Sequence, residues 1–168
     1  MHRTIYTYQY YYIMPNLSAE LLPVVELKTG PLHTHTIIWM HGLGADGNDF
    51  VPIVNELKLP QDNQTKFILP HAPVRPVTIN NGYVMRAWYD ISNTNGEDEL
   101  GIRNSQKAID ALIENEIQNG IASDNVLLAG FSQGGVMALQ VGLRHNNPLG
   151  GIIALSCYLS QADTLLDE

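Results

Sequence analysis

The chain has 168 residues, of which 45% are hydrophobic and 15% charged, a composition typical of one globular domain with a single core. No apolar run reaches the length of a membrane span, and a formal net charge of -8 repels nucleic acid and anionic surfaces, so we expect neither kind of partner. The single cysteine, Cys157, cannot form an internal disulfide and favours a reducing, cytoplasmic location.

Residues 1–13 are rich in tyrosine and lack the aliphatic core and small-residue cleavage site of a signal peptide. Two alternatives remain for them: a disordered tail, or an upstream extension that precedes a start at Met14. We therefore expect residues 1–18 to be a disordered N-terminal extension and residues 19–168 to form the domain.

Short apolar runs alternate with longer helical patterns through the first half of this domain, which predicts strand-helix units around a parallel sheet. Strands are expected at residues 23–27, 36–40 and 66–69, with a helix at residues 49–57. The second strand is apolar throughout, as in a strand buried on both faces. Pro73 and Pro76 predict that residues 71–81 are irregular.

The second half continues the same alternation. Apolar side chains recur every three or four residues after Glu97, and this spacing predicts a helix that ends near Gly120. A buried strand at residues 126–129, a helix at 132–145 and a last strand at 152–155 follow. The expected fold class is therefore α/β, with a mostly parallel sheet and helices on both faces.

Gly130-Phe131-Ser132-Gln133-Gly134 is the only G-x-S-x-G in the chain, and it joins a predicted strand to a predicted helix, as a nucleophile elbow requires. So tight a turn leaves no room for side chains two residues before and after the serine. Ser132 would stand exposed at a positive helix terminus, where developing negative charge is stabilised. A glycine-rich turn that contains a serine by chance is the alternative, and the strand-turn-helix placement disfavours it.

The loop after the second strand, residues 41–47, contains three glycines that would let its backbone turn toward Ser132. An acyl-transfer intermediate needs two N–H groups directed at one oxygen. By their placement, the backbone N–H groups of Leu43 and Gln133 are the candidate oxyanion-hole donors.

Three segments, His41-Gly42-Leu43-Gly44, residues 81–90 and residues 130–135, together resemble the bacterial carboxylesterase, phospholipase and acyl-protein thioesterase family over residues 22–159. The resemblance implies an α/β-hydrolase fold and a cytoplasmic serine hydrolase of short to medium acyl esters or thioesters, without cofactor or metal. It implies Ser132 as the nucleophile and Leu43 and Gln133 as the oxyanion donors. Trp88 matches a family segment near the acyl pocket and is a candidate substrate-binding residue, although a plain core aromatic fits equally well. His41 and His71 match positions that support turns.

The chain departs from the family after the elbow. The triad order is Ser, then Asp or Glu, then His, but the only later histidine is His145, about 20 Å along the nucleophile's own helix. It cannot act as the base. We therefore expect a partial domain that lacks the last strand-helix units and is C-terminally incomplete, with its final strand covered by another chain, for example in a homodimer.

Two hypotheses follow for function. The first is a serine carboxylesterase or thioesterase that works through an acyl-serine intermediate on a small-molecule substrate. The second is a truncated, non-catalytic remnant that at most binds an acyl ligand or a partner, and the missing acid and base predict that the 168-residue chain alone is inactive. Among other candidates, the His33 and His35 pair is more readily explained as a solvated strand edge than as a metal site, and Cys157 as a packing residue.

Overall fold

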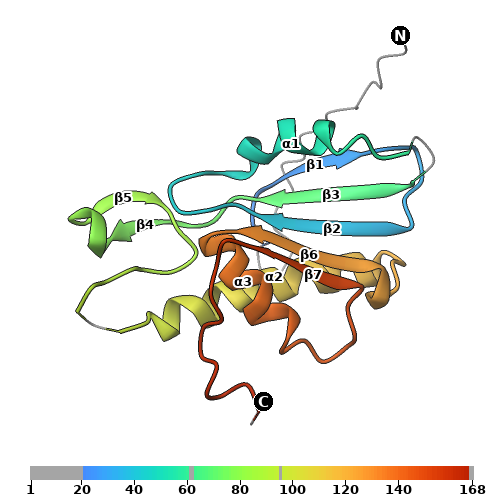
Figure 1. Cartoon of the computed structure of the whole chain (residues 1–168). Coiled ribbons are helices and arrows are strands. Elements are labelled where there is room, and N and C mark those ends of the chain that lie inside the picture. The colour runs from blue at the N-terminus through green and yellow to red at the C-terminus, as the bar shows by residue number, and fades with distance from the viewer. Residues whose placement is uncertain (1–20, 61–62, 95, 167–168) are drawn as a thin grey trace.

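The computed structural model describes residues 21–60, 63–94 and 96–166, so the predicted extension at residues 1–18 lies outside the described part. Its centre is a five-stranded sheet in the order β1-β3-β2-β6-β7 (Figure 1). The strands are β1 (Val24–Lys28), β2 (His35–Met40), β3 (Thr65–Pro70), β6 (Val126–Phe131) and β7 (Gly151–Leu155). Only β1 pairs antiparallel, with β3, and the other neighbours are parallel. The predicted strands are thus present, with ends displaced by one or two residues.

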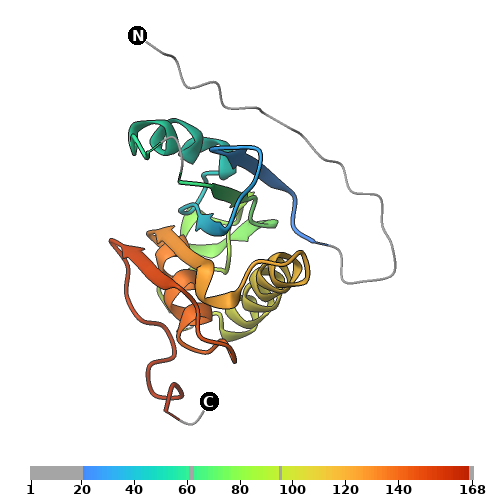
Figure 2. The same cartoon turned by 90° about the vertical axis from the view of Figure 1, so that its right-hand side faces the viewer.

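Helices cover both faces of this sheet (Figure 2). A short 3-10 turn (Gly47–Phe50) leads into α1 (Val51–Glu56) on one face, whereas α2 (Glu99–Gln118) and α3 (Gln133–Gly142) pack on the other. Consecutive residues of β2 serve both sides, since Ile38 and Met40 belong to the core under α2 and α3 and Trp39 to the core under α1. Burial on both faces explains the uninterrupted apolar sequence of this strand. The fold class predicted from sequence is confirmed.

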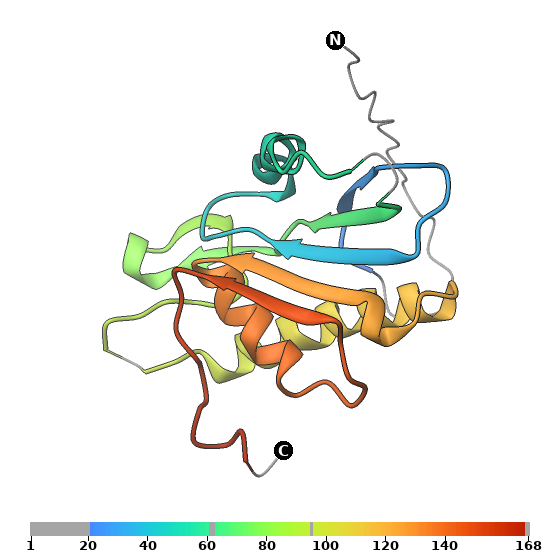
Figure 3. The ribbon, with the colours of Figure 1, turned by 45° about the vertical axis from the view of Figure 1, so that its right-hand side comes forward.

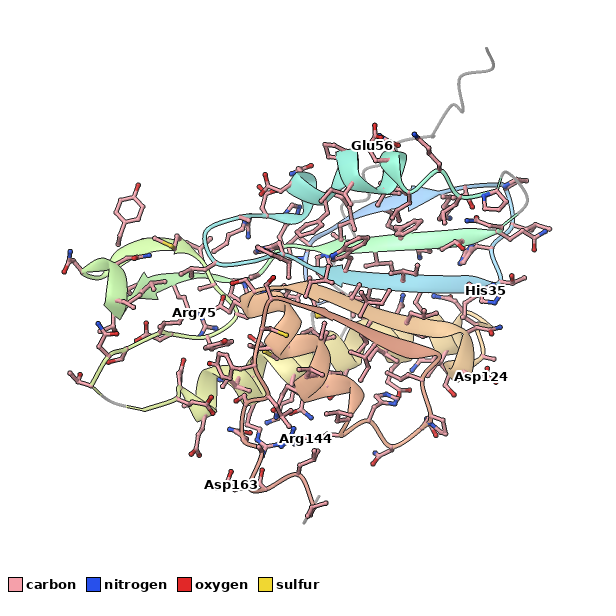
Figure 4. The ribbon with its side chains drawn as sticks, in the orientation of Figure 1. His35, Glu56, Arg75, Asp124, Arg144 and Asp163 are labelled. Atoms are coloured by element: carbon pink, nitrogen blue, oxygen red, sulfur yellow. The ribbon has the colours of Figure 1, made fainter. Side chains whose placement is uncertain are left out.

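The helix α2 follows the predicted periodicity. Asp98 caps it by accepting a hydrogen bond from the Gly101 N–H, and its buried face includes Ile102, Ile109 and Ile113. Near its other end, the fully buried Glu116 binds Lys66 Nζ at 2.8 Å and accepts a hydrogen bond from Thr36 Oγ1 at 2.7 Å. This polar cluster lies at the amino ends of the parallel strands, the end of the sheet where Figure 4 labels His35 and Asp124.

The prediction that residues 71–81 are irregular is wrong. The strand β4 (Val74–Val77), a 3-10 turn (Thr78–Asn80) and β5 (Tyr83–Arg86) form an antiparallel hairpin. A two-stranded ribbon tolerates Pro76, because a residue on an edge strand need not donate to a ladder. Asn81 and Gly82, with φ of 55° and 75°, close the turn. The hairpin projects from the carboxyl end of the main sheet (Figure 1).

Two smaller differences concern the C-terminal half. The helix predicted at residues 132–145 ends at Gly142, and a third 3-10 turn (Ser123–Asn125) precedes β6. The last strand, β7, borders the sheet beside β6 (Figure 3), and its Ile153 and Leu155 remain 42% and 41% exposed. No helix in the described part of the chain is long and apolar enough to cross a membrane.

Candidate active site

Ser132 stands at the turn from β6 into α3, at the carboxyl end of the parallel strands (Figure 1). Its backbone has φ 53° and ψ -121°, a conformation that L side chains rarely adopt. Backbone hydrogen bonds hold it there: the Ser132 N–H donates to Leu155 O at 2.9 Å, and the Ser132 carbonyl accepts from Gly135 and Val136 at 2.9 and 3.1 Å. Such strain, about 1–3 kcal/mol, persists only where the surroundings fix it, and it occurs most often at functional sites.

The flanking glycines are required by close backbone approach. A Cβ on Gly130 would lie 2.1 Å from Gly134 O, and a Cβ on Gly134 would lie 2.2 Å from Met40 O. At Gly135 it would lie 2.8 Å from Cys157 Sγ. No side chain fits at these distances, so the G-x-S-x-G pattern has the steric origin expected from the sequence.

The loop between β2 and the 3-10 turn at Gly47–Phe50, residues 41–46, lies against this elbow. A Cβ placed on Gly42 would be 3.5 Å from Ser132 Cβ, and Gly44 has the positive φ of 75° that its turn requires. Neither the Leu43 N–H nor the Gln133 N–H donates to an acceptor among the described residues. Gln133 is the first residue of α3, where N–H groups lack intrahelical acceptors and the helix dipole is positive. One unpaired donor therefore directly follows Ser132 in the chain, and the other directly follows Gly42, which lies against Ser132.

A buried hydrogen-bond network joins the three segments that carry the family resemblance. Trp88, completely buried, donates from Nε1 to His41 O at 2.8 Å and from its backbone N–H to Gln133 Oε1 at 2.8 Å. Gln133 Nε2 in turn donates to Tyr89 O at 2.8 Å. This side-chain role of Gln133 has no signal in the sequence, because its partners are more than 40 residues away. The burial of Trp88 favours the core-aromatic alternative, and its contact with substrate stays a prediction.

None of the five described histidines is bonded to the Ser132 hydroxyl, which has no hydrogen-bond partner in the described part of the chain. His41 contacts Gly42 O and the Ala72 N–H, and His71 accepts from the Gly47 N–H at 3.2 Å. Burial lowers the pKa of both side chains, which favours their neutral forms. The remaining three contact other groups: His33 with Glu116, His35 with Thr34 and His145 with Glu114. Within the described ranges, no group of three acidic, histidine or cysteine side chains could hold a metal ion.

The segment after β7 contacts the residues that precede α2 and those that follow α3. Ser160 Oγ donates to Glu97 Oε2 at 2.8 Å, and Arg144 Nη2 donates to Gln161 O at 2.6 Å. Figure 4 shows Arg144, just after the C-terminus of α3, near Asp163. Asp163 lines a polar cavity together with Glu97 and Gln161. Cys157 is half-buried, and desolvation raises the pKa of its thiol, which suits a packing role better than that of a nucleophile.

A strained serine elbow at the carboxyl edge of a mostly parallel sheet, with helices on both faces, defines an α/β-hydrolase fold. The chain belongs to the phospholipase/carboxylesterase family, whose model matches residues 22–167. It is 40% identical over 159 residues to acyl-protein thioesterase 1 of Gibberella zeae, a match that covers 89% of this chain and 67% of that protein. Identity to acyl-protein thioesterase 1 of Neurospora crassa is 46% over 136 residues, covering 76% and 56%. Both relatives are fungal and do not support the expected bacterial likeness.

Solved structures agree with this assignment. Arabidopsis thaliana SOBER1 superposes with a TM-score of 0.73 at 33% identity, over 79% of this chain and 66% of that one. For Zea mays acyl-protein thioesterase 2 the TM-score is 0.69 at 29% identity, over 86% and 65%. The chain thus spans between 56% and 67% of the length of these relatives.

Proposed function

We propose that this chain is a serine hydrolase that cleaves carboxylic esters or thioesters of short to medium acyl chains. Ser132 Oγ attacks the carbonyl carbon, its proton passes to the departing alcohol or thiol, and water then hydrolyses the acyl-serine to the free acid and returns a proton to Ser132 Oγ. The N–H groups of Leu43 and Gln133 stabilise the oxyanion in both steps. The observation that carries the proposal is the strained backbone of Ser132, φ 53° and ψ -121°, which packing imposes on a serine at a helix N-terminus.

The substrate class is inferred from the surroundings of the elbow and from the relatives. Phe131 is 45% exposed, and its Cδ1 lies 3.4 Å from the position of a Cβ on Gly42, so an apolar ring stands beside the nucleophile. Such a surface suits an acyl chain. Because two relatives are named acyl-protein thioesterases, acyl thioesters of proteins are the first substrates to test. The reaction needs no cofactor, and the single cysteine suits a reducing, cytoplasmic setting.

A second candidate is a non-catalytic domain that binds an acyl ligand or a partner. It is favoured by one observation: in the described residues, the Ser132 hydroxyl has neither a histidine nor a carboxylate as hydrogen-bond acceptor. Without a base the hydroxyl stays protonated, and removal of triad members leaves about 10³–10⁴-fold acceleration over water. The expected inactivity of the 168-residue chain belongs to this candidate.

A fluorophosphonate probe and a chromogenic thioester separate the two candidates. The matched control is Ser156→Ala, because Ser156 is exposed and also has a positive φ, 51°, but lies outside the elbow. A hydrolase labels and turns over in the wild type and in Ser156→Ala, and loses both in Ser132→Ala. Binding of a fatty acid without labelling would support the second candidate. Labelling that persists in Ser132→Ala would refute Ser132 as the nucleophile.

A further inference from the structure

We propose that His41 is a positioning residue of the oxyanion hole, which fixes the plane of the Gly42–Leu43 peptide and thereby directs the Leu43 N–H toward the reacting oxygen. The role rests on the proposed function, in which Leu43 is a donor. It also excludes His41, which belongs to the loop at residues 41–46 that lies against the elbow, as the missing base.

The ring of His41 is completely buried, and both its nitrogens are occupied. Nδ1 lies 2.7 Å from Gly42 O, which can only accept, so Nδ1 carries the proton. Nε2 lies 3.0 Å from the Ala72 N–H, which can only donate, so Nε2 is the acceptor. These two partners define one neutral tautomer. Desolvation lowers the pKa of His41, consistent with this neutral ring.

The hydrogen bond from His41 to Gly42 O orients the Leu43 N–H through the geometry of the peptide group. The Gly42 C=O and the Leu43 N–H are the two ends of one planar trans unit and point in opposite directions. Anchoring the oxygen to the buried ring therefore directs the Leu43 N–H away from that ring, in a loop whose Gly42 lies against the elbow, where a Cβ on Gly42 would be 3.5 Å from Ser132 Cβ. The same oxygen also accepts a longer hydrogen bond, 3.3 Å, from the Ala45 N–H, and Gly42 has no side chain that could restrict this peptide.

The neighbouring peptides are anchored as well. The His41 carbonyl accepts from Trp88 Nε1 at 2.8 Å, and the Gly44 N–H donates to Arg86 O at 2.9 Å. The Leu43 N–H between them remains without an acceptor in the described residues. A backbone fixed on both sides of one free donor is preorganised, and preorganised donors stabilise an oxyanion without reorganisation.

Two substitutions separate the hydrogen bonds of the ring. The amide nitrogen of Asn occupies roughly the place of Nδ1, so His41→Asn retains a donor for Gly42 O. Gln reaches the place of Nε2, so His41→Gln retains an acceptor for the Ala72 N–H and loses the donor. We expect His41→Gln to lower kcat by about 10²-fold, the loss typical of one oxyanion donor, with KM unchanged. His41→Asn should recover most of this loss. If His41 acted only by holding Ala72, His41→Asn would instead have the lower kcat of the two variants.

His71→Ala is the matched control, because it removes a hydrogen bond that another histidine accepts from the Gly47 N–H, at the far end of the same loop segment. It should leave kcat unchanged after correction for the folded fraction. Equal kcat values for His41→Gln and the wild type would overturn the proposal.

NMR on the wild-type chain tests the same point without turnover. Long-range ¹H–¹⁵N correlations should show the Nδ1–H tautomer of His41 at pH 8. In the variants, the Leu43 amide signal should move in His41→Gln and stay near its wild-type position in His41→Asn and His71→Ala. A wild-type chain without ester turnover would contradict the proposed function alone, whereas an Nε2–H tautomer or a protonated ring would overturn the role of His41.

Discussion

Gly134→Ala tests whether close packing between α3 and β2 creates the elbow. The new Cβ would lie 2.2 Å from Met40 O and 2.5 Å from His41 O, both of them backbone atoms that no rotamer change can move. Ordinary contacts need more than 3 Å, so α3 must shift by about 1 Å; overpacking on this scale costs about 3 kcal/mol. The better helix propensity of Ala returns at most about 1 kcal/mol.

Urea unfolding followed by tryptophan fluorescence measures the difference. With a slope of about 1.5 kcal/mol per molar, a net loss of about 2 kcal/mol lowers the midpoint by about 1.3 M. Gly142→Ala is the control on the same helix, because its Cβ would meet side-chain rather than backbone atoms, with Ile152 Cδ1 at 2.6 Å and Cγ1 at 2.7 Å, and a side chain can move. We expect its midpoint to fall clearly less than that of Gly134→Ala. Equal midpoints for Gly134→Ala and Gly142→Ala would refute the steric reasoning.

Three further predictions concern strain, pH and the open strand. Ser132→Gly should raise the free energy of unfolding by about 1 kcal/mol while abolishing acyl transfer, because glycine adopts φ 53° without strain; a lower melting temperature would contradict this. Burial raises the pKa of Asp110, whose Oδ1 has no partner, so its ionised form opposes folding. Asp110→Asn should therefore stabilise the protein at pH 7, with a gain that vanishes as pH falls from the raised folded pKa through the unfolded value of about 3.9; a gain that is constant with pH would exclude the carboxylate as its cause. The β7 edge should associate, so gel filtration should show a dimer that Ile153→Lys converts to monomer, and a wild-type monomer at all concentrations would count against it.

Most of the fold is predictable from local patterns. The apolar run of β2 and the three-and-four spacing of α2 reflect burial that each segment requires by itself. The hairpin β4–β5 could not be predicted in this way, because the prolines that normally interrupt strands are tolerated in a two-stranded ribbon. The two strands of the hairpin are stabilised by pairing with each other, so the composition of either one alone does not predict them.

The candidate site divides in the same way. Gly130, Ser132 and Gly134 are predictable because a tight turn imposes fixed spacing within five residues. The bonds from Gln133 to Trp88 and Tyr89 link distant segments, and the ring contacts of His41 depend on where Ala72 lies. Such contacts are set by tertiary packing, so the sequence offers the residue types but not their partners.

The central claim is that Ser132 is the acyl-accepting nucleophile, and trapping the acyl-enzyme tests it most directly. The full chain is mixed with an activated acetyl ester, quenched in acid and digested, and the peptides are analysed by mass spectrometry. We predict one acetyl group on Ser132, at higher occupancy than on any lysine and absent from Ser132→Ala, because this half-buried serine lies at the elbow beside two unpaired N–H donors. Ester hydrolysis with no acyl group on Ser132, or with the acyl group on Cys157, would contradict the account.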